Sequence, residues 1–349
     1  MANIAVGSLN LVSTLSPTLL ERMPISGSGD PGVLLSTLGF EVNKINRVPV
    51  EYGLASSQST VIAAAITAAT AGDVLYFGQG DVRIDTQITQ TKNLKVYGRG
   101  TRLNVSTNIT GWVISSSAAN GSEFEGISFV GNNTGAAQIG LATTAVAGFK
   151  IRNCNLTSFN VAGLQIGAAS NTTPYPLNEI TDCRATLCNG IGFNVLATGE
   201  YCTFTACGAS GNLTGWKLAA GNLTLQGCSG TGGTTGLLVD TGSNNGHLTV
   251  QGGHFNHNTT NINVNAITAG NGISFTGVQA FSGNIIFNSD VITWTAGQIS
   301  ATTITTNITA LRVLFNGVII HGTPTIAGTG TANNAWANCY TNLGVAYSG

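Results

Sequence analysis

The stretch Phe149-Lys150-Ile151-Arg152-Asn153-Cys154 decides the fold, because its pattern returns along the chain at variable spacing. Each copy alternates polar and apolar residues and ends in a small turn residue followed by a cysteine or another small residue. The later copies are Asn178–Cys183, Cys202–Cys207, Leu223–Cys228, Leu248–Gly253 and Ile273–Val278. A second half-unit begins with Gly or Asn and reads Gly163–Ile166, Gly192–Val195, Gly215–Leu218, Gly236–Val239, Asn261–Val264 and Asn284–Phe287.

Both series advance by 21 to 29 residues per copy and show no helical period. Such a repeat of short strands indicates a solenoid of stacked β-coils. Because side chains alternate across a strand, the central apolar residue of each first half-unit is expected to point inward. These inward residues are Ile151, Ile180, Phe204, Leu225, Val250 and Phe275. The turn residues Asn153, Asp182, Ala206, Gly227, Gly252 and Gly277 share one position, where Asn, Asp and Gly tolerate a left-handed backbone.

The composition excludes several classes of protein. Only 8% of the 349 residues are charged and the net charge is −1, so no electrostatic footprint for nucleic acid exists. No apolar run is long enough to cross a membrane, and no secretory signal is recognisable. Seven cysteines make an odd number, and four of them recur at one place in successive coils, which favours free buried thiols. We expect no metal and no cofactor.

The chain divides into three parts. Residues 1–52 contain four prolines and no repeat, and they are expected to be a separate attachment segment. Residues 53–290 are expected to form the solenoid, with a helix near 60–71 covering its open end, because unpaired strand edges invite association. Residues 291–349 are Thr-, Gly- and Asn-rich, and we expect a small C-terminal β region that is a possible trimerisation element.

The segment from Ala65 to Gly80, followed by Asn93 to Gly100, resembles the start of the right-handed, single-stranded parallel β-helix in the pectate-lyase-like superfamily. The chain departs from that pattern at Gln79, where the family often has a proline, and near Val82, where it often has an aromatic residue. Among members of the superfamily, trimeric bacteriophage tailspikes are most similar in organisation. The resemblance implies an all-β homotrimer attached to a virion through residues 1–52, and contacts with other tail proteins.

Candidate site residues lie on the outward face of the coils. Glu179 and Glu200 fall in the only strongly charged part of the repeat, near the insertion Gly167–Leu177, and are candidates for the carboxylate pair that glycoside hydrolysis needs. Tyr175 stands in an insertion beside them and is a candidate for binding. Thr205, Gln226 and Gln251 are outward polar residues and candidates for binding a polymer. Solvated surface carboxylates are the alternative interpretation for Glu179 and Glu200.

Three functions compete. The first is a virion spike that recognises host cell-surface polysaccharide, since a rigid solenoid offers repeated hydrogen-bonding groups to a repeating glycan. The second adds cleavage of that glycan by a glycosidase or lyase activity, and whether the chain is an enzyme stays open. The third is a structural fibre or an ice-binding solenoid, which the Thr-rich outward pairs suggest but their irregularity disfavours.

Overall fold

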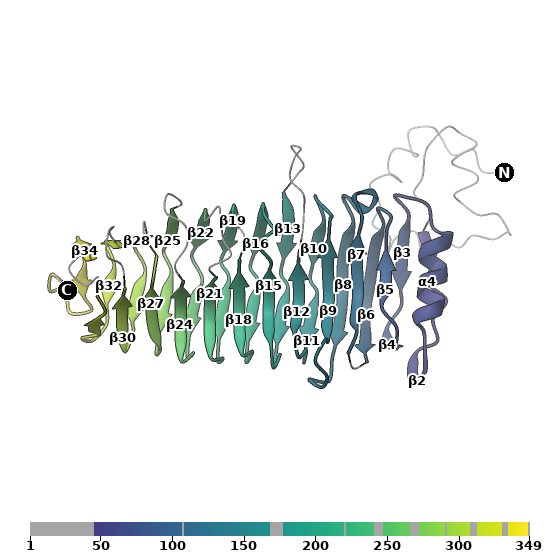
Figure 1. Ribbon diagram of the computed structural model, residues 1–349, viewed down its shortest axis with the longest axis horizontal. Coiled ribbons are helices and arrows are strands. Elements are labelled where there is room, and N and C mark those ends of the chain that lie inside the picture. Colours follow the sequence, from purple (N-terminus) through teal and green to yellow (C-terminus); the bar gives the residue numbers. More distant parts are fainter. Residues whose placement is uncertain are drawn as a thin grey trace, which may run out of the picture. The chain divides into compact units, whose positions relative to one another are not determined.

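The computed structural model describes residues 45–106, 108–167, 177–219, 221–240, 247–265, 272–289, 292–307, 313–329 and 334–347. The chain divides into two compact units, Met1–Lys44 and Ile45–Gly349. The first unit lies outside the described residues, and so does most of the expected attachment segment. The second unit is the parallel β-helix that the sequence predicts, and successive coils stack along one axis (Figure 1).

From β3 to β33 each coil contributes a segment to each of three faces, and the strands on these faces pair in parallel. The first face consists of β1 (Ile45–Arg47), β3 (Val74–Phe77), β6 (Lys95–Val105), β8 (Glu123–Val130), β10 (Lys150–Arg152), β13 (Asn178–Thr181), β16 (Cys202–Thr205), β19 (Leu223–Gln226), β22 (Leu248–Gln251), β25 (Ile273–Thr276), β28 (Ile292–Thr295), β31 (Val313–Asn316) and β34 (Asn334–Ala337). The long strands β6 and β8 continue onto the second face and join the first two faces into one sheet of 24 strands.

The second face also contains β2 (Gly53–Ser57), β4 (Gly80–Ile84), β11 (Asn155–Thr157), β14 (Arg184–Thr186), β17 (Gly208–Ser210), β20 (Ser229–Thr231), β23 (His254–Asn256), β26 (Gln279–Phe281), β29 (Gln298–Ser300), β32 (Ile319–Ile320) and β35 (Tyr340–Thr341). The third face is a separate sheet of 11 strands. Its strands are β5 (Ile88–Gln90), β7 (Thr110–Ser115), β9 (Ile139–Thr144), β12 (Ala162–Ile166), β15 (Ile191–Val195), β18 (Thr214–Leu218), β21 (Thr235–Val239), β24 (Thr260–Val264), β27 (Asn284–Phe287), β30 (Thr303–Thr306) and β33 (Thr325–Ala327).

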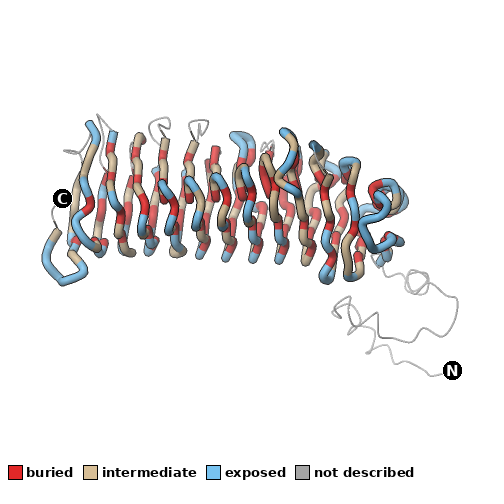
Figure 2. Tube along the Cα trace, turned by 90° about the horizontal axis from the view of Figure 1, so that it is seen from below, coloured by how far each residue is buried: buried red, intermediate tan, exposed pale blue. Residues whose placement is uncertain are grey.

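The core fills the space between the three faces. Burial alternates along each coil, as expected for strands with one face inside (Figure 2). The expected inward row is confirmed, since all six of its predicted members are fully buried and are paired with one another in register. Trp216 is also fully buried, stacks on Phe193 at 4.2 Å between ring centroids, and donates from Nε1 to the Ser229 carbonyl at 2.8 Å. It therefore packs the core, as predicted.

The turn between the first two faces is the same in every coil from β10 to β35. Two residues connect the strands each time, and the first of them has a positive φ. The six residues predicted for this position all have φ between 50° and 66°, which confirms the left-handed turn. Asp182 (φ 53°) is one of them, so its place in the turn is explained by backbone geometry.

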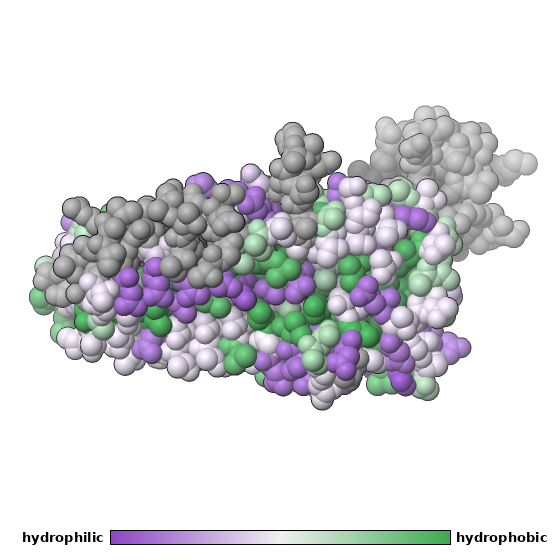
Figure 3. All heavy atoms as spheres, viewed as in Figure 1, coloured by the Kyte–Doolittle hydropathy of each residue, from purple (hydrophilic) through white to green (hydrophobic). Residues whose placement is uncertain are grey.

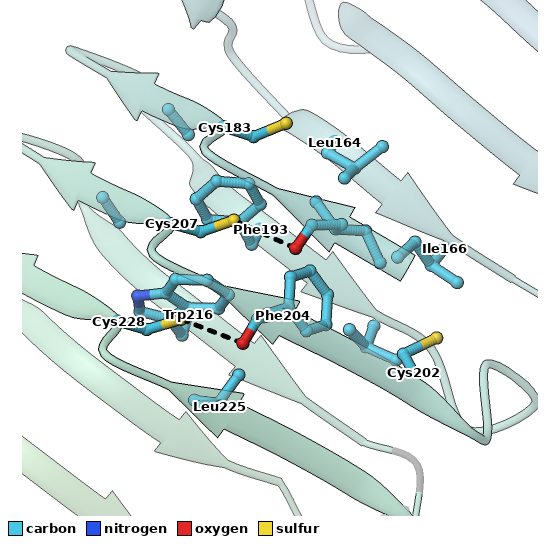
Figure 4. Packing of buried hydrophobic residues seen from close by; sticks show 14 of the residues in the cluster. Leu164, Ile166, Cys183, Phe193, Cys202, Phe204, Cys207, Trp216, Leu225 and Cys228 are labelled. Atoms are coloured by element: carbon cyan, nitrogen blue, oxygen red, sulfur yellow. Dashed lines mark hydrogen bonds between the residues drawn. The ribbon is translucent and has the colours of Figure 1, made fainter. Parts of the chain in front are cut away.

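The second residue of that turn points into the core, and there the cysteines form a ladder (Figure 4). Cys207 Sγ donates to the carbonyl of Ile180 one coil earlier at 3.4 Å, and Cys228 Sγ donates to that of Phe204 at 3.4 Å. All seven cysteines of the chain are buried and free. Burial raises the pKa of the Cys202 thiol to about 12, so it stays protonated at neutral pH.

The N-terminal end of the core is covered by α4 (Ser59–Ala68), which lies where the sequence predicts a capping helix. Ile62 and Ile66 are buried and belong to the core cluster. The C-terminal carbonyls of α4 are bound by Lys92, whose Nζ donates to Ile66, Thr67 and Ala69 at 3.3, 2.8 and 2.8 Å. A cation at this position satisfies orphan carbonyls and complements the helix dipole.

The stack extends beyond the limits expected for the solenoid. At its start, β1 pairs with β3 and Val48 is buried in the core, although both precede residue 53. At its end, β28 pairs with β25, and the same register continues through β31 and β34. The described residues after 291 therefore form further coils, because the inward residues Trp294 and Phe315 continue the row of Phe275.

Candidate functional site

The outer surface of the first face is built from two rows of side chains, one on either side of the inward row. The first row, in coil order, is Lys95, Glu123, Lys150, Glu179, Thr203, Thr224, Thr249, Ser274 and Thr293. The second row is Tyr76, Tyr97, Glu125, Arg152, Thr181, Thr205, Gln226, Gln251, Thr276 and Thr295.

The second row changes character at Thr181 on β13, and the first row changes one coil later, at Thr203 on β16. Before these positions the rows carry charged and aromatic residues, which we call the charged patch: Tyr76, Lys95, Tyr97, Glu123, Glu125, Lys150, Arg152 and Glu179. From β16 to β28 they carry only hydroxyls and amides, which we call the hydroxyl–amide track: Thr203, Thr205, Thr224, Gln226, Thr249, Gln251, Ser274, Thr276, Thr293 and Thr295. Neighbouring coils place equivalent atoms about 4.8 Å apart along this track.

Unlike charges alternate along the first row of the charged patch. Lys95 Nζ lies 3.8 Å from Glu123 Oε1, and Lys150 Nζ lies 3.6 Å from Glu179 Oε2. Arg152 Nη2 also approaches Glu179 Oε2, at 3.5 Å. These side chains are about one-fifth to one-half exposed, so each pair contributes only about 0–1 kcal/mol to stability. The pairs mainly fix where the charges lie.

Tyr97 connects the aromatic part of the patch to its charges. Its hydroxyl donates to Glu123 Oε2 at 3.2 Å. Burial and, after it, the negative charge of Glu123 raise the pKa of Tyr97 to about 12. The phenol is therefore neutral at physiological pH and serves as a donor to that carboxylate.

Glu123 and Glu125 are functional candidates that the sequence analysis missed. They stand two residues apart on β8, so both point outward and their Cα atoms are about 6.6 Å apart along the strand. Within the part of the chain that the structure describes, Glu125 has no hydrogen bond or ion pair through its side chain. The signal was present as Glu-Phe-Glu at 123–125, a polar–apolar alternation just before the first copy of the repeat.

The two glutamates of the predicted carboxylate pair lie in different parts of the coil, one on a strand and the other in the corner before the next strand. Glu179 lies on β13 and is held by Lys150 and Arg152. Glu200 precedes β16, and its backbone carbonyl accepts from Asn178 Nδ2 at 3.3 Å. The residue opposite Glu179 in the ladder is Thr203, three positions after Glu200. The two glutamates are therefore not ladder partners, and their joint catalytic role stays a prediction.

The predicted binding residues are partly placed. Thr205, Gln226 and Gln251 are consecutive members of the second row, so the structure brings them together within the hydroxyl–amide track. Both glutamines are exposed and Thr205 is half-buried. Tyr175 lies outside the described residues. The described residues contain no group of three or more His, Cys, Asp or Glu side chains that could hold a metal ion. Among the helical residues described, none belongs to a helix with the length and hydrophobicity needed to span a bilayer.

The sequence matches no protein-family model and no curated protein. Solved structures are similar, however. The A-module of a mannuronan C-5 epimerase from Azotobacter vinelandii has a TM-score of 0.58 at 15% identity, with coverage of 87% of this chain and 93% of that one. A tailspike of Acinetobacter baumannii bacteriophage Fri1, described as a capsular polysaccharide depolymerase, has a TM-score of 0.57 at 12% identity.

That match covers 88% of this chain but 64% of the tailspike, so the chain corresponds to less than two thirds of that protein. A protein of Geobacillus virus E2 has a TM-score of 0.50 at 12% identity, with coverage of 89% of this chain and 61% of that one. At such identities the likeness concerns the fold. The parallel β-helix expected from the resemblance to the pectate-lyase-like superfamily and to tailspikes is thereby confirmed.

Proposed function

We propose that this chain is the β-helical part of a bacteriophage tailspike, which binds polysaccharide on the surface of the host bacterium. The observation that carries the proposal is the hydroxyl–amide track, because two rows of uncharged hydrogen-bonding groups repeat over five successive coils. A glycan presents donors and acceptors at a regular interval and suits such a surface. Among similar structures, the tailspike described as a capsular polysaccharide depolymerase and the mannuronan C-5 epimerase support the assignment.

The binding test uses two exposed residues of the track. The double variant Gln226→Ala, Gln251→Ala is expected to lose at least tenfold in binding to an array of bacterial capsular and O-antigen polysaccharides. The matched control is Gln279→Ala, since Gln279 is an exposed glutamine on the second face. Equal binding by the double variant and the wild type would remove the track from the site.

The assembly proposed here is a homotrimer in the virion, attached to other tail proteins through the N-terminal segment, with the C-terminal part holding the subunits together. Native mass by light scattering should give three chains, and a single-chain mass would contradict this.

Removing residues 1–44 leaves β1 in place and should abolish incorporation into virions while the trimer persists. Normal incorporation would show that attachment lies elsewhere.

Cleavage of the bound glycan is a second candidate function, favoured by the outward carboxylates of the charged patch. Retaining and inverting glycosidases both need two carboxyl groups. We therefore compare the double variant Glu179→Gln, Glu200→Gln with Glu123→Gln, Glu125→Gln, measuring both binding and release of reducing ends. Loss of release in only one of them, with binding kept, identifies the pair. Absence of release by the wild type on every polysaccharide that it binds would leave a binding protein alone.

A further inference from the structure

The edge between the second and third faces carries no Asp, Glu, Lys or Arg from β8 to β33. Nine described segments form this edge, which we call the second edge: 131–138, 158–161, 187–190, 211–213, 232–234, 257–259, 282–283, 301–302 and 321–324. The other two edges do carry charge, at Asp182 and at Glu200. Each of the three faces also presents charged side chains, such as Glu179, Arg184 and Lys217. The second edge is therefore the uncharged side of the solenoid.

Two exposed leucines lie next to each other on the second edge. Leu187 is 60% exposed and Leu213 is 54% exposed. They belong to consecutive coils, since the backbone N–H of Leu213 donates to the Cys188 carbonyl at 3.0 Å. Val161 on the same edge and Ile191 at the start of β15 are half-buried. The apolar surface continues onto the third face, where hydrophobic residues gather in the region of β9, β12 and β15 (Figure 3).

The backbone of Leu187 is left-handed, with φ 56°. This conformation costs free energy for a residue that has a Cβ. In other coils the same position holds small or polar residues with φ between 58° and 68°, namely Ser158, Gly211, Gly232, His257 and Ser282. Asn133 holds the backbone in place, because its Nδ2 donates to the Leu187 carbonyl at 2.8 Å. The chain therefore keeps a large apolar side chain at a strained position, where it buries less than half of its surface.

Symmetry restricts which side of the solenoid can face the other subunits of a trimer. Where three solenoids lie parallel around one axis, residues on the edge nearest to that axis meet their own copies at the same height. Like charges that meet in this way repel, whereas leucines that meet bury apolar surface. The second edge satisfies both conditions. The other two edges do not, because they would bring three copies of Asp182 or of Glu200 together.

We propose that the second edge faces the threefold axis of a parallel trimer, where Leu187 and Leu213 pack against their copies in the two other subunits. The occupants of this surface are thus further copies of the same chain. The inference rests on the proposed homotrimer and adds to it the surface that the subunits bury along the solenoid.

The first test places a thiol at the axis. All seven native cysteines are buried, so a short bismaleimide should join none of them in the folded protein. Leu213→Cys should give covalently linked chains on a denaturing gel, because each introduced thiol lies beside its copies. The matched control is Leu177→Cys, since Leu177 is 51% exposed on the edge between the third and first faces. Copies of Leu177 point away from the axis, so this control should give single chains.

The second test measures what the contact contributes to assembly. The double variant Leu187→Asn, Leu213→Asp keeps a residue that tolerates the left-handed backbone and brings three carboxylates together. Its trimer should dissociate at a protein concentration about tenfold higher than the wild-type trimer or more. Added salt should partly restore the trimer, because it screens the carboxylates. Leu177→Asp should assemble like the wild type.

The outcomes separate the inference from the proposed homotrimer. Linked chains from Leu213→Cys alone, together with a weakened trimer in the double variant, support the inference. A trimeric wild type whose Leu213→Cys variant gives single chains overturns the inference and leaves the homotrimer intact. Equal linking by Leu213→Cys and Leu177→Cys also overturns it, since the chains then react in random collisions. An unchanged trimer in the double variant does so as well. A single-chain wild type overturns both, while glycan binding is measured independently.

Discussion

Replacing Gly253 with alanine tests how closely one coil packs on the next, and the adjacent Gly252 supplies a matched control. Both glycines have a positive φ, 64° at Gly252 and 80° at Gly253. A Cβ added at Gly252 meets no atom within 4 Å. A Cβ added at Gly253 would lie 2.8 Å from the nitrogen and 2.9 Å from the carbonyl carbon of Cys228, and closer still to its oxygen. Only the second substitution must therefore move backbone.

The expected magnitudes follow from these surroundings. A Cβ on a left-handed residue costs about 1–2 kcal/mol, and the lower entropy of the unfolded chain offsets about 0.4–1 kcal/mol of it. Gly252→Ala should thus lower the free energy of unfolding by about 1 kcal/mol. Gly253→Ala also disturbs the bonds from His254 N to the Cys228 carbonyl and from Gln279 N to the Gly253 carbonyl, both 3.1 Å. Disrupting these two backbone hydrogen bonds adds about 0.5–1.5 kcal/mol each.

The assay is chemical denaturation combined with hydrogen exchange of the peptides covering β22, β23 and β26. Gly253→Ala should show a clearly lower midpoint than Gly252→Ala and faster exchange in those strands. Equal midpoints for the two variants would refute the argument. The loss in free energy of unfolding would then come entirely from the left-handed backbone, with no contribution from the contact with Cys228.

Three further predictions rest on single contacts. Lys92→Met leaves three carbonyls of α4 without their cation, so exchange of the amides in 59–68 should rise and stability should fall by about 1–3 kcal/mol; unchanged exchange there would contradict it. The pKa of Tyr97 is raised from 10 to about 12 in the folded protein, so the folded state holds the phenol proton more tightly than the unfolded state. The contribution of Tyr97 to the free energy of unfolding is therefore complete below pH 10 and is lost as the pH rises toward 12. The difference in unfolding free energy between wild type and Tyr97→Phe should change in that window, and a constant difference would refute the assigned shift. The seven buried thiols should be silent toward a disulfide reagent in the folded protein and all react in denaturant; a fast-reacting thiol in the native state would show that the ladder is open to solvent.

The repeating part of the fold could be predicted because the apolar alternation and the turn residue of each copy define which residues pair between coils. Ile151 and Ile180 proved to be ladder partners, and Asn153 and Asp182 share the left-handed turn, as their alignment indicated. Period-two alternation fixes which side chains enter the core, and a small residue marks the corner. Helix α4 was equally readable, since Ile62 and Ile66 follow a helical spacing.

The charged patch was harder to predict than the hydroxyl–amide track, because part of it lies where the repeat is least regular. Glu123 and Glu125 stand on β8, a long strand that spans two faces and has a register shift against β6 between Tyr97 and Thr101. No copy of the repeat aligns this strand with β10, so the alternating charges from Lys95 to Glu179 cannot be assembled from the sequence.

The unequal lengths of the three corners have an evolutionary consequence. From β10 to β35 the first corner always contains two residues and the second contains two to four, whereas the corner between the third and first faces varies from four to eleven. Insertions therefore accumulate along one edge, and the left-handed turns hold the opposite edge unchanged. The connecting segments at this edge can therefore change in length from coil to coil while the strands stay the same, and foreign segments can be grafted there.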